Sequence, residues 1–419
     1  MDLNGLEKVD PEIAAVIRAE QRRQAETLEL IASENHVSPS VLTALGSVLT
    51  DKYAEGYPAK RYYCGNENVD RAEQICIDRA KKLFGAEHAN VQPHCGTSAN
   101  LAVYLAALRP GAKIMGMELA HGGHLSHGMK INASGIFYKT AGYGVDPDTE
   151  MLDMAEVRRR VLEERPDLLV VGASAYPRVI DFAAFGGIAA EAGCLLLADI
   201  AHIAGLVVGG VHPNPVPHST FVTTTNHKTL RGPRGGIILC KAEWARRIDT
   251  AVFPGLQGGP LEHVIAAKAV AFHEAMKPQF RHYAEAIVAN AKALAGELMA
   301  RDWRLVSGGT DNHLMLIDLR SRDAELTGHV AANWLAEAGI ICNKNVVPFD
   351  PRKPLHASGI RLGTPALTTR GMGAEQMKTV AGWIDRVLTS RGGEAVLREV
   401  GGGVLELCRQ FPIPNDNGA

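Results

Sequence analysis

Several features that mark membrane, secreted and nucleic-acid-binding proteins are missing from this sequence. The apolar runs are broken well short of the length that crosses a membrane. The first residues, Met1–Asn4, show neither a basic flank nor an apolar core, so we expect no secretory signal. Basic residues form no run longer than Arg158–Arg160, and a formal net charge of −2 argues against a nucleic-acid groove. We therefore expect a soluble globular protein.

Paired cysteines and nucleotide-binding glycine patterns are also absent. The seven cysteines are odd in number and scattered, and none forms a Cys-X-X-Cys pair, which is typical of reduced thiols in a cytosol. No P-loop and no dinucleotide-binding glycine motif occurs, so the nucleotide-binding interpretations are weak. We expect a cytoplasmic protein whose chemistry depends on other motifs.

The length of 419 residues predicts more than one hydrophobic core. Patterns typical of strands and helices alternate from about residue 85 to 240, which favours an α/β fold with a mostly parallel sheet and helices on both faces. The composition changes near residue 300. We expect an N-terminal helical arm (1–27), a large domain (28–280) and a smaller α/β C-terminal domain (281–419).

Two consecutive apolar segments each lead to a polar residue that could take part in catalysis. The run Leu195–Ala198 ends in Asp199, and the run Phe221–Val222 leads to Lys228. Taken alone, such a lysine is usually a surface residue and such an aspartate a helix cap. An aspartate about thirty residues before a lysine, both at strand ends, is nevertheless what a pyridoxal phosphate enzyme needs. The lysine forms the covalent imine, and the carboxylate keeps the pyridine nitrogen protonated.

The segment Tyr53–Tyr63 is unusual in a chain that is poor in aromatic residues. Four of the nine tyrosines fall within it, together with glycine and proline. It is either a packed surface loop or an active-site loop in which Glu55 transfers protons and the tyrosines orient charges.

Two further turns could face a ligand. The segment Cys95–Ser98 leads from a strand into a helix rich in alanine and leucine, so its free amides are either a phosphate cradle or a simple helix cap. Three histidines lie within His121–His127, which suggests a metal site. Paired glycines and the lack of a nearby carboxylate or thiol make a metal the weaker interpretation, and we predict none. A flat imidazole resting on a flat cofactor is the better use of one of them.

A single arginine, Arg361, stands between apolar neighbours in the segment Ser358–Pro365. A buried charge in such a place is costly without a partner. The partner is either the carboxylate of an amino-acid substrate or an internal aspartate or glutamate. The sequence leaves both open.

Taken together, these motifs resemble the serine hydroxymethyltransferase family of fold-type I pyridoxal phosphate enzymes. The resemblance runs from Leu28–Asn35 to Arg361–Pro365 and includes the Tyr53–Tyr63, His121–Gly128, Thr223–Gly236 and Phe253–Pro260 segments. It implies an aspartate aminotransferase-like fold, with a mostly parallel seven-stranded sheet in the large domain and a smaller α/β C-terminal domain. It also implies an obligate homodimer, because glycines from a second subunit would help to hold the phosphate, and it leaves open whether dimers pair into tetramers.

The resemblance also implies roles for particular residues. The catalytic set would be Lys228, Glu55, Tyr53, Tyr63, His124 and Asp199. The cofactor would be held by Lys228, Cys95, Gly96, Thr97, His124, Ser174, Asp199, His202 and His227, and by Gly258 and Gly259 of the second subunit. The amino-acid substrate would contact Ser33, Tyr53, Glu55, Tyr63, His202 and Arg361. Tetrahydrofolate would contact Glu55, Leu119, Leu125 and Asn345.

The implied reaction interconverts serine (or α-methylserine) and glycine (or alanine), with tetrahydrofolate as the one-carbon acceptor. A folate-independent aldolase or threonine transaldolase on the same scaffold is the alternative, and a catalytically silent binding protein is a third. Cys64, Asn226 and Phe349 differ from the residues usual in the family at those places. Asn226 sits beside the lysine, so we expect it to influence what the pocket tolerates around the substrate.

Overall fold

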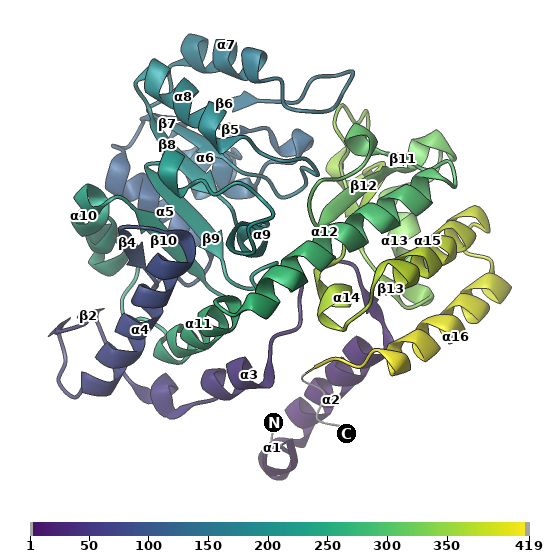
Figure 1. Ribbon diagram of the computed structural model, residues 1–419, viewed down its shortest axis with the longest axis horizontal. Helices are drawn as coiled ribbons and strands as arrows, with labels where there is room; N and C mark the ends of the chain where they lie inside the picture. Colours follow the sequence, from purple (N-terminus) through teal and green to yellow (C-terminus); the bar gives the residue numbers. More distant parts are fainter. Residues whose placement is uncertain (1–2, 415–419) are drawn as a thin grey trace.

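The computed structural model describes residues 3–414 and shows two lobes joined by one long helix, α12 (Figure 1). The chain begins with the predicted helical arm, formed by α1 (Leu3–Val9) and α2 (Pro11–Glu26). Asp10 caps α2 through its side chain, and Pro11 occupies the first turn, where its missing N–H costs nothing. Within the described residues, no helix combines the length and apolarity needed to cross a membrane.

A seven-stranded sheet forms the centre of the large domain. In spatial order its strands are β4 (His88–Asn90), β10 (Gly236–Cys240), β9 (Phe221–Thr225), β8 (Leu195–Asp199), β7 (Leu168–Val171), β5 (Lys113–Met117) and β6 (Lys139–Tyr143). Only β10 runs antiparallel to its neighbours in this sheet. The predicted mostly parallel seven-stranded sheet is therefore confirmed.

Both faces of this sheet are buried under helices. Successive residues of a strand point to opposite faces, so Leu169 and Val171 of β7 join one core while Leu168 and Val170 join the other. The first core is completed by α4 (Glu67–Phe84), α7 (Met154–Glu164) and α8 (Phe182–Ala192). The second is completed by α5 (Gly96–Ala107) and α10 (Ala245–Thr250). Burial on both faces explains why these strands are continuously apolar.

The small domain is built on a four-stranded antiparallel sheet. Its order is β11 (Arg304–Leu305), β12 (Leu314–Asp318), β15 (Gly359–Gly363) and β14 (Asn343–Asn345). Its core is closed by α13 (Gly328–Glu337), α15 (Ala374–Thr389) and α16 (Glu394–Gln410). The remaining elements include α3 (Pro39–Leu45), β2 (Gly56–Tyr57), β3 (Lys60–Arg61), α6 (Ala133–Phe137), α9 (Ala204–Val208), α11 (Glu262–Ala275) and α14 (Pro365–Thr369).

The two domains share parts of the chain that a simple division would separate. Strand β1 (Leu28–Glu29) pairs in parallel with β13 (Ile340–Ile341), so Leu28 lies in the core of the small domain. Helix α12 (Pro278–Met299) contributes its first half to the large core and its second half to the small core. The boundaries at residues 28 and 281 stay a prediction, and the structure shows that the second falls inside a helix.

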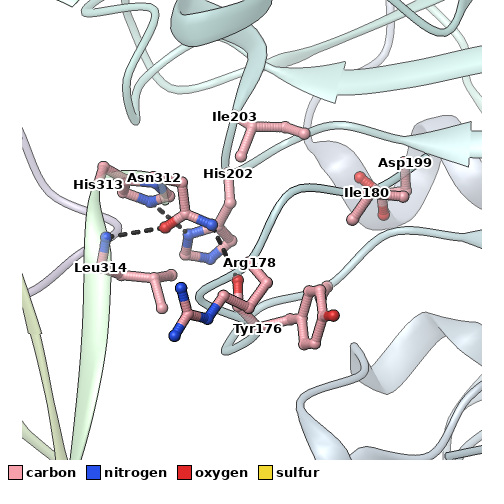
Figure 2. Close-up of a pocket in the computed structure, with 10 residues that line it drawn as sticks. Tyr176, Arg178, Ile180, Asp199, His202, Ile203, Asn312, His313 and Leu314 are labelled. Carbon is pink, nitrogen blue, oxygen red and sulfur yellow. Dashed lines mark hydrogen bonds between the residues drawn. The ribbon is translucent and has the colours of Figure 1, made fainter. Parts of the chain in front are cut away.

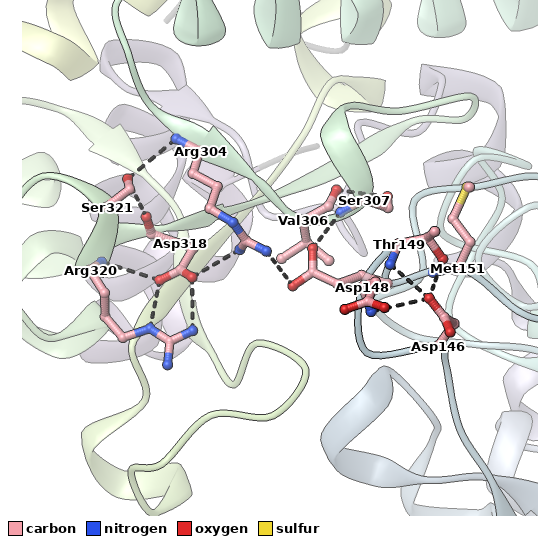
Figure 3. A network of polar contacts seen from close by, with 11 residues as sticks. Asp146, Asp148, Thr149, Met151, Arg304, Val306, Ser307, Asp318, Arg320 and Ser321 are labelled. Atoms are coloured by element: carbon pink, nitrogen blue, oxygen red, sulfur yellow. Dashed lines mark hydrogen bonds and ion pairs between the residues drawn. The ribbon is translucent and has the colours of Figure 1, made fainter.

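A polar network also joins the domains (Figure 3). The buried carboxylate of Glu150, in a loop of the large domain, accepts a hydrogen bond from the backbone N–H of Ser307 at 2.8 Å and pairs with Arg304 at 2.7 Å. Arg304 in turn contacts Asp318 at 2.9 Å. Because Asp318 ends β12, this chain of contacts fixes the small-domain sheet against the large domain.

Candidate active site

The polar residues predicted at strand ends converge at one edge of the large sheet. In a parallel sheet the carboxyl ends of the strands open onto the same side, where α/β proteins bind their ligands. A cavity lies there, beyond the ends of β5, β7, β8 and β9. It is lined by Gly96, His124, His127, Ala173, Ser174, Asp199, Ala201, His202, Thr225 and Lys228. Seven of the predicted site residues thus meet in one place: Gly96, His124, Ser174, Asp199, His202, Lys228 and, from the neighbouring domain, Arg361.

Asp199, the last residue of β8, is held in place by three donors. Its Oδ2 accepts hydrogen bonds from Asn100 Nδ2 at 2.8 Å and His127 Nε2 at 2.9 Å, and its Oδ1 accepts from the backbone N–H of Ala201 at 3.1 Å. Burial alone would raise the pKa of this carboxyl group, but the hydrogen bond from His127 and the nearby histidines hold its pKa well below the ordinary value. Asp199 is therefore an anion at neutral pH, and its Oδ1 keeps a lone pair for a further donor.

Lys228 lies in the turn after β9 and is buried. Burial lowers the pKa of its amine to about 8, against the opposing effect of the Asp199 charge, and Arg361 and Arg234 lower it further. A substantial fraction of the amine is thus neutral near pH 8 and can act as a nucleophile. The backbone carbonyl of Lys228 accepts a hydrogen bond from Asn35 Nδ2 at 2.9 Å, which fixes the turn.

His124 faces the same cavity with a defined tautomer. Its Nδ1 lies 2.7 Å from Ser126 Oγ and accepts the backbone N–H of Ser126 at 3.2 Å, so the proton belongs on Nε2. Burial lowers the pKa of His124 to about 4, which keeps the ring neutral at neutral pH. A neutral, flat ring of this kind suits contact with a flat heterocycle. His227 is also held: its Nε2 lies 2.9 Å from Arg234, and burial lowers its pKa to about 3.

The predicted phosphate turn forms the start of α5. Cys95 caps this helix, its Sγ accepting the backbone N–H of Ser98 at 3.5 Å, and Gly96 and Thr97 form the first turn. A Cβ atom on Gly96 would lie 2.8 Å from Cγ2 of Thr225, so this position needs glycine. The first turn of the helix leaves backbone amides available at the cavity.

Arg361, on β15 of the small domain, reaches across to the large domain. Its Nη1 donates to the carbonyl of Ser174 at 2.6 Å and its Nε to Oδ1 of Asn343 at 3.2 Å. The described part of the chain offers no carboxylate partner, and burial lowers the pKa of Arg361 to about 10. The alternative of an internal aspartate or glutamate partner is therefore excluded within residues 3–414, and an external carboxylate would satisfy this group.

His202 completes this side of the site and also contacts the small domain (Figure 2). Its Nδ1 lies 3.2 Å from Nε2 of His313, which precedes β12. Burial holds the pKa of His202 well below its ordinary value and lowers that of His313 to about 3. Both rings are neutral, so one donates and the other accepts in this contact.

Five other predicted site residues form a separate cluster on the same chain. A Cβ on Gly258 would lie 3.1 Å from Oε1 of Glu55, and one on Gly259 would lie 3.3 Å from the ring of Tyr53. The Tyr53 ring packs edge-on against Tyr63, with centroids 5.3 Å apart. None of these residues lines the cavity around Lys228. Strand β2, which follows Glu55, lies at the lower left edge of the large domain, far from the junction of the two lobes (Figure 1).

Three positions implied for folate fall on two segments, which we call the rim segments: Leu119 and Leu125 on one, and Asn345 on the other. Leu119 and Leu125 are exposed and flank His121, whose ring packs against Phe349 with centroids 4.7 Å apart. Phe349 belongs to the loop that follows Asn345 at the end of β14. The two rim segments are therefore adjacent. Ser33 lies in the turn that follows β1, outside the residues that line the cavity around Lys228.

Asn226 was expected to influence the pocket from its place beside Lys228. Its side chain is fully buried, and its Nδ2 lies 3.0 Å from the place of a Cβ on Gly235, next to Lys268. The backbone explains this: Asn226 directly follows β9, where its amide pairs with the carbonyl of Gly235. Asn226 is not among the residues that line the cavity around Lys228, and its influence on the substrate stays a prediction.

Several residues of the site could not be found from the motifs. Asn100 connects Thr223 to Asp199, His127 holds Asp199, Asn35 holds the Lys228 turn, and Asn343 and His313 contact Arg361 and His202. Asn35 carried a signal as the polar end of an apolar segment, and His127 carried one as a member of the three clustered histidines. The others depend on contacts between residues far apart in the chain.

His124, His127 and Asp199 also have the geometry of a possible metal site. One ligand atom from each lies within 4.8 Å of the others. The sequence separation of Asp199 concealed this carboxylate. Hydrogen bonds from His127 to Asp199 and between His124 and Ser126 already occupy ligand atoms of this group, so the prediction of no metal stands as a prediction.

Comparison with known proteins identifies relatives for this arrangement. Residues 6–384 match the family described as serine hydroxymethyltransferase. A protein of Rippkaea orientalis (strain PCC 8801 / RF-1) named serine hydroxymethyltransferase is 59% identical over 405 residues, which cover 96% of this chain and 95% of that protein.

The pKa of Lys228 gives a direct test of the site. With brief exposure to formaldehyde and borohydride, labelling of Lys228 should rise with a midpoint near pH 8, because its pKa is lowered from 10.5 to about 8. In Asp199→Asn the midpoint should move to lower pH, because the Asp199 charge raises this pKa. Peptide mass spectrometry measures the labelling. A midpoint close to that of an ordinary lysine, about 10.4, or no effect of Asp199→Asn, would contradict the geometry.

Proposed function

The chain belongs to the serine hydroxymethyltransferase family, and we infer from this premise that its cavity interconverts serine and glycine by pyridoxal phosphate-dependent hydroxymethyl transfer. The α/β fold, with its mostly parallel seven-stranded sheet, is that of fold-type I pyridoxal phosphate enzymes. The observation that carries the proposal is an ionised Asp199 and a nucleophilic Lys228 lining one cavity.

The residues of the cavity fit pyridoxal phosphate. Lys228 presents a partly neutral amine to an aldehyde, Asp199 presents the lone pair of Oδ1 to a ring N–H, and the first turn of α5 presents amides to a phosphate. When bound, pyridoxal phosphate supplies a protonated ring that accepts the electron pair left by bond cleavage at the α-carbon of an amino acid.

Each protein group has a defined task in this proposal. Asp199, fixed by Asn100 and His127, holds the proton on the ring nitrogen, so negative charge developing on the ring is stabilised without reorganisation. Lys228 would hold the cofactor through its amine, and the amino group of serine would compete for the same position. The neutral imidazole of His124 would provide a flat surface for the ring, and its low pKa prevents it from adding a competing positive charge.

The small domain supplies the specificity for amino acids. Arg361 is buried and has no carboxylate partner within the described chain, so the α-carboxylate of the substrate satisfies it in a bidentate pair. His202 and Ser33 are the neighbouring contacts of this carboxylate in the proposal. In this proposal the hydroxyl group of serine gives up its proton as the Cα–Cβ bond breaks, and the one-carbon unit leaves as formaldehyde. Formaldehyde condenses with tetrahydrofolate with loss of water, and the electron pair left on Cα takes up a proton to give glycine.

Tetrahydrofolate is proposed to bind at the rim formed by Leu119, Leu125 and Asn345. The exposed leucines offer an apolar surface, and the Phe349–His121 contact brings the two rim segments together. The named relative favours this reaction over a folate-independent aldolase or transaldolase. α-Methylserine and alanine remain further candidates for the substrate and the product.

We further propose a homodimer in which each site is built from two chains. Glu55, Tyr53 and Tyr63 lie with Gly258 and Gly259, away from the Lys228 cavity of their own chain. If the glycines hold the phosphate of the neighbouring subunit, the same cluster delivers Glu55 to that subunit as its acid or base. A cytoplasmic location is part of the proposal, since the cysteines of the described chain are all unpaired.

The dependence of serine cleavage on tetrahydrofolate tests the proposed reaction. Purified protein reconstituted with pyridoxal phosphate is given serine, threonine or α-methylserine, with and without tetrahydrofolate, and glycine or alanine is measured. Serine cleavage should accelerate many-fold with folate, because the acceptor removes the one-carbon unit. Fast threonine cleavage together with serine cleavage that ignores folate would instead identify an aldolase.

Mixing two inactive variants tests the shared site. Lys228→Ala and Glu55→Ala should each lose nearly all activity. Random re-association of equal amounts should restore about a quarter of the wild-type activity, because half of the dimers are mixed and each mixed dimer has one intact site. Re-association without any recovery would place Glu55 and Lys228 of the same chain in one site.

A further inference from the structure

Lys268, in the middle of α11, is a buried cation that the proposed reaction does not use. Only 1% of its surface is exposed. Its ammonium group donates to three backbone carbonyls: Val91 at 2.7 Å, Pro93 at 3.2 Å and Gly236 at 2.9 Å. An ammonium group has three N–H donors, so all of them are used.

Burying the charged amine of Lys268 costs free energy, which indicates that the ammonium group does more than fill space. Burial lowers the pKa of Lys268 to about 8, and the partly opposing charges come from Cys76, Glu73 and Glu262. No carboxylate within the described residues forms an ion pair with it, so neutral carbonyls carry most of its stabilisation. A methionine would fill the same volume without this cost.

The three carbonyls lie around the turn at the start of α5. Val91 and Pro93 belong to the segment between β4 and that turn, and Gly236 begins β10. The N–H of Gly236 donates to the carbonyl of Pro93 at 3.0 Å. A Cβ on Gly236 would lie 2.6 Å from the carbonyl oxygen of Cys95 and 3.2 Å from the nitrogen of Gly96, so β10 packs directly against the turn.

Lys268 connects the backbone of the segment before α5 to the backbone of β10, because its ammonium group donates to carbonyls of both. The segment has a second tether on its other side, where Gln257 accepts the N–H of His94 at 3.1 Å and donates to the carbonyl of Gln92 at 2.9 Å. Without the ammonium group, the carbonyls of Val91, Pro93 and Gly236 lose a shared donor in a region closed to water. The turn would then be free to move relative to the sheet.

We propose that Lys268 is a positioning residue that holds the Cys95–Gly96 turn in the place where its free amides meet the phosphate of the cofactor. The inference rests on the proposed binding of pyridoxal phosphate. Lys268 contacts neither the cavity nor the reacting atoms, so its effect reaches the ligand only through the backbone of the turn.

The test compares two ligands that differ by the phosphate alone. Apo-protein carrying Lys268→Met is titrated with pyridoxal phosphate and with pyridoxal, and the absorbance of the lysine-bound aldehyde gives each Kd. Lys292→Met, at an exposed position of α12, is the matched control. Arginine is unsuitable as a conservative variant, because a Cβ on the neighbouring Gly235 would already lie 2.5 Å from Cε of Lys268.

Lys268→Met should bind pyridoxal phosphate at least about tenfold more weakly, while its affinity for pyridoxal should change by less than about twofold. A merely structural role would weaken both ligands alike or neither, and either result overturns the proposal. If Lys268→Met does not fold, Lys268→Gln, which keeps two donors on a shorter chain, should show the same selective loss to a smaller degree. Wild-type protein that binds neither ligand would instead refute the proposed function.

Discussion

The buried carboxylate of Asp199 is the constraint on which the rest of the site depends. A charge in this position is stable only because Asn100, His127 and the backbone of Ala201 all donate to it. Those donors come from three different segments, so the order of strands in the sheet is what brings them together. The same charge raises the pKa of Lys228 against the effect of burial, and Ser126, which fixes the tautomer of His124, also accepts a hydrogen bond from Asn100, one of the donors to Asp199. The groups proposed to act on the cofactor are therefore positioned by the order of the strands in the sheet.

The second constraint is the fixed relation between the domains. Arg361 belongs to the small domain, but its guanidinium group donates to the carbonyl of Ser174 in the large domain. Helix α12 is buried in both cores, and Glu150 pairs with Arg304 across the junction. A substrate carboxylate that binds Arg361, as proposed, would thus be held at a set distance from the groups beyond the strand ends. Proximity of this kind supplies much of the catalytic advantage in enzymes that bind small substrates.

Local patterns in the sequence predicted the fold class and the strand-end residues well. Asp199 and Lys228 each follow a short apolar strand, and both the strand and its end are encoded within a few residues. Asn100, His313 and Lys268 carried no such signal, since each makes a contact with a residue that lies 99 to 177 positions away in the chain. The sequence placed Asn226 beside Lys228 but could not show that its side chain is buried outside the lining of the cavity, because proximity in sequence does not determine which face of a turn a residue occupies. The domain boundary was hidden by α12, whose apolar stripe serves two cores without a change in helical pattern.

The protonation of the cofactor nitrogen is the most direct measure of the central claim, that Asp199 is an anion placed to hold that proton. Nitrogen NMR of the protein loaded with pyridoxal phosphate labelled at the ring nitrogen reports this state. At neutral pH the wild-type protein should show a protonated ring nitrogen, and Asp199→Ala should show an unprotonated one. An unprotonated nitrogen in the wild-type protein, or the same signal in both proteins, would contradict the account.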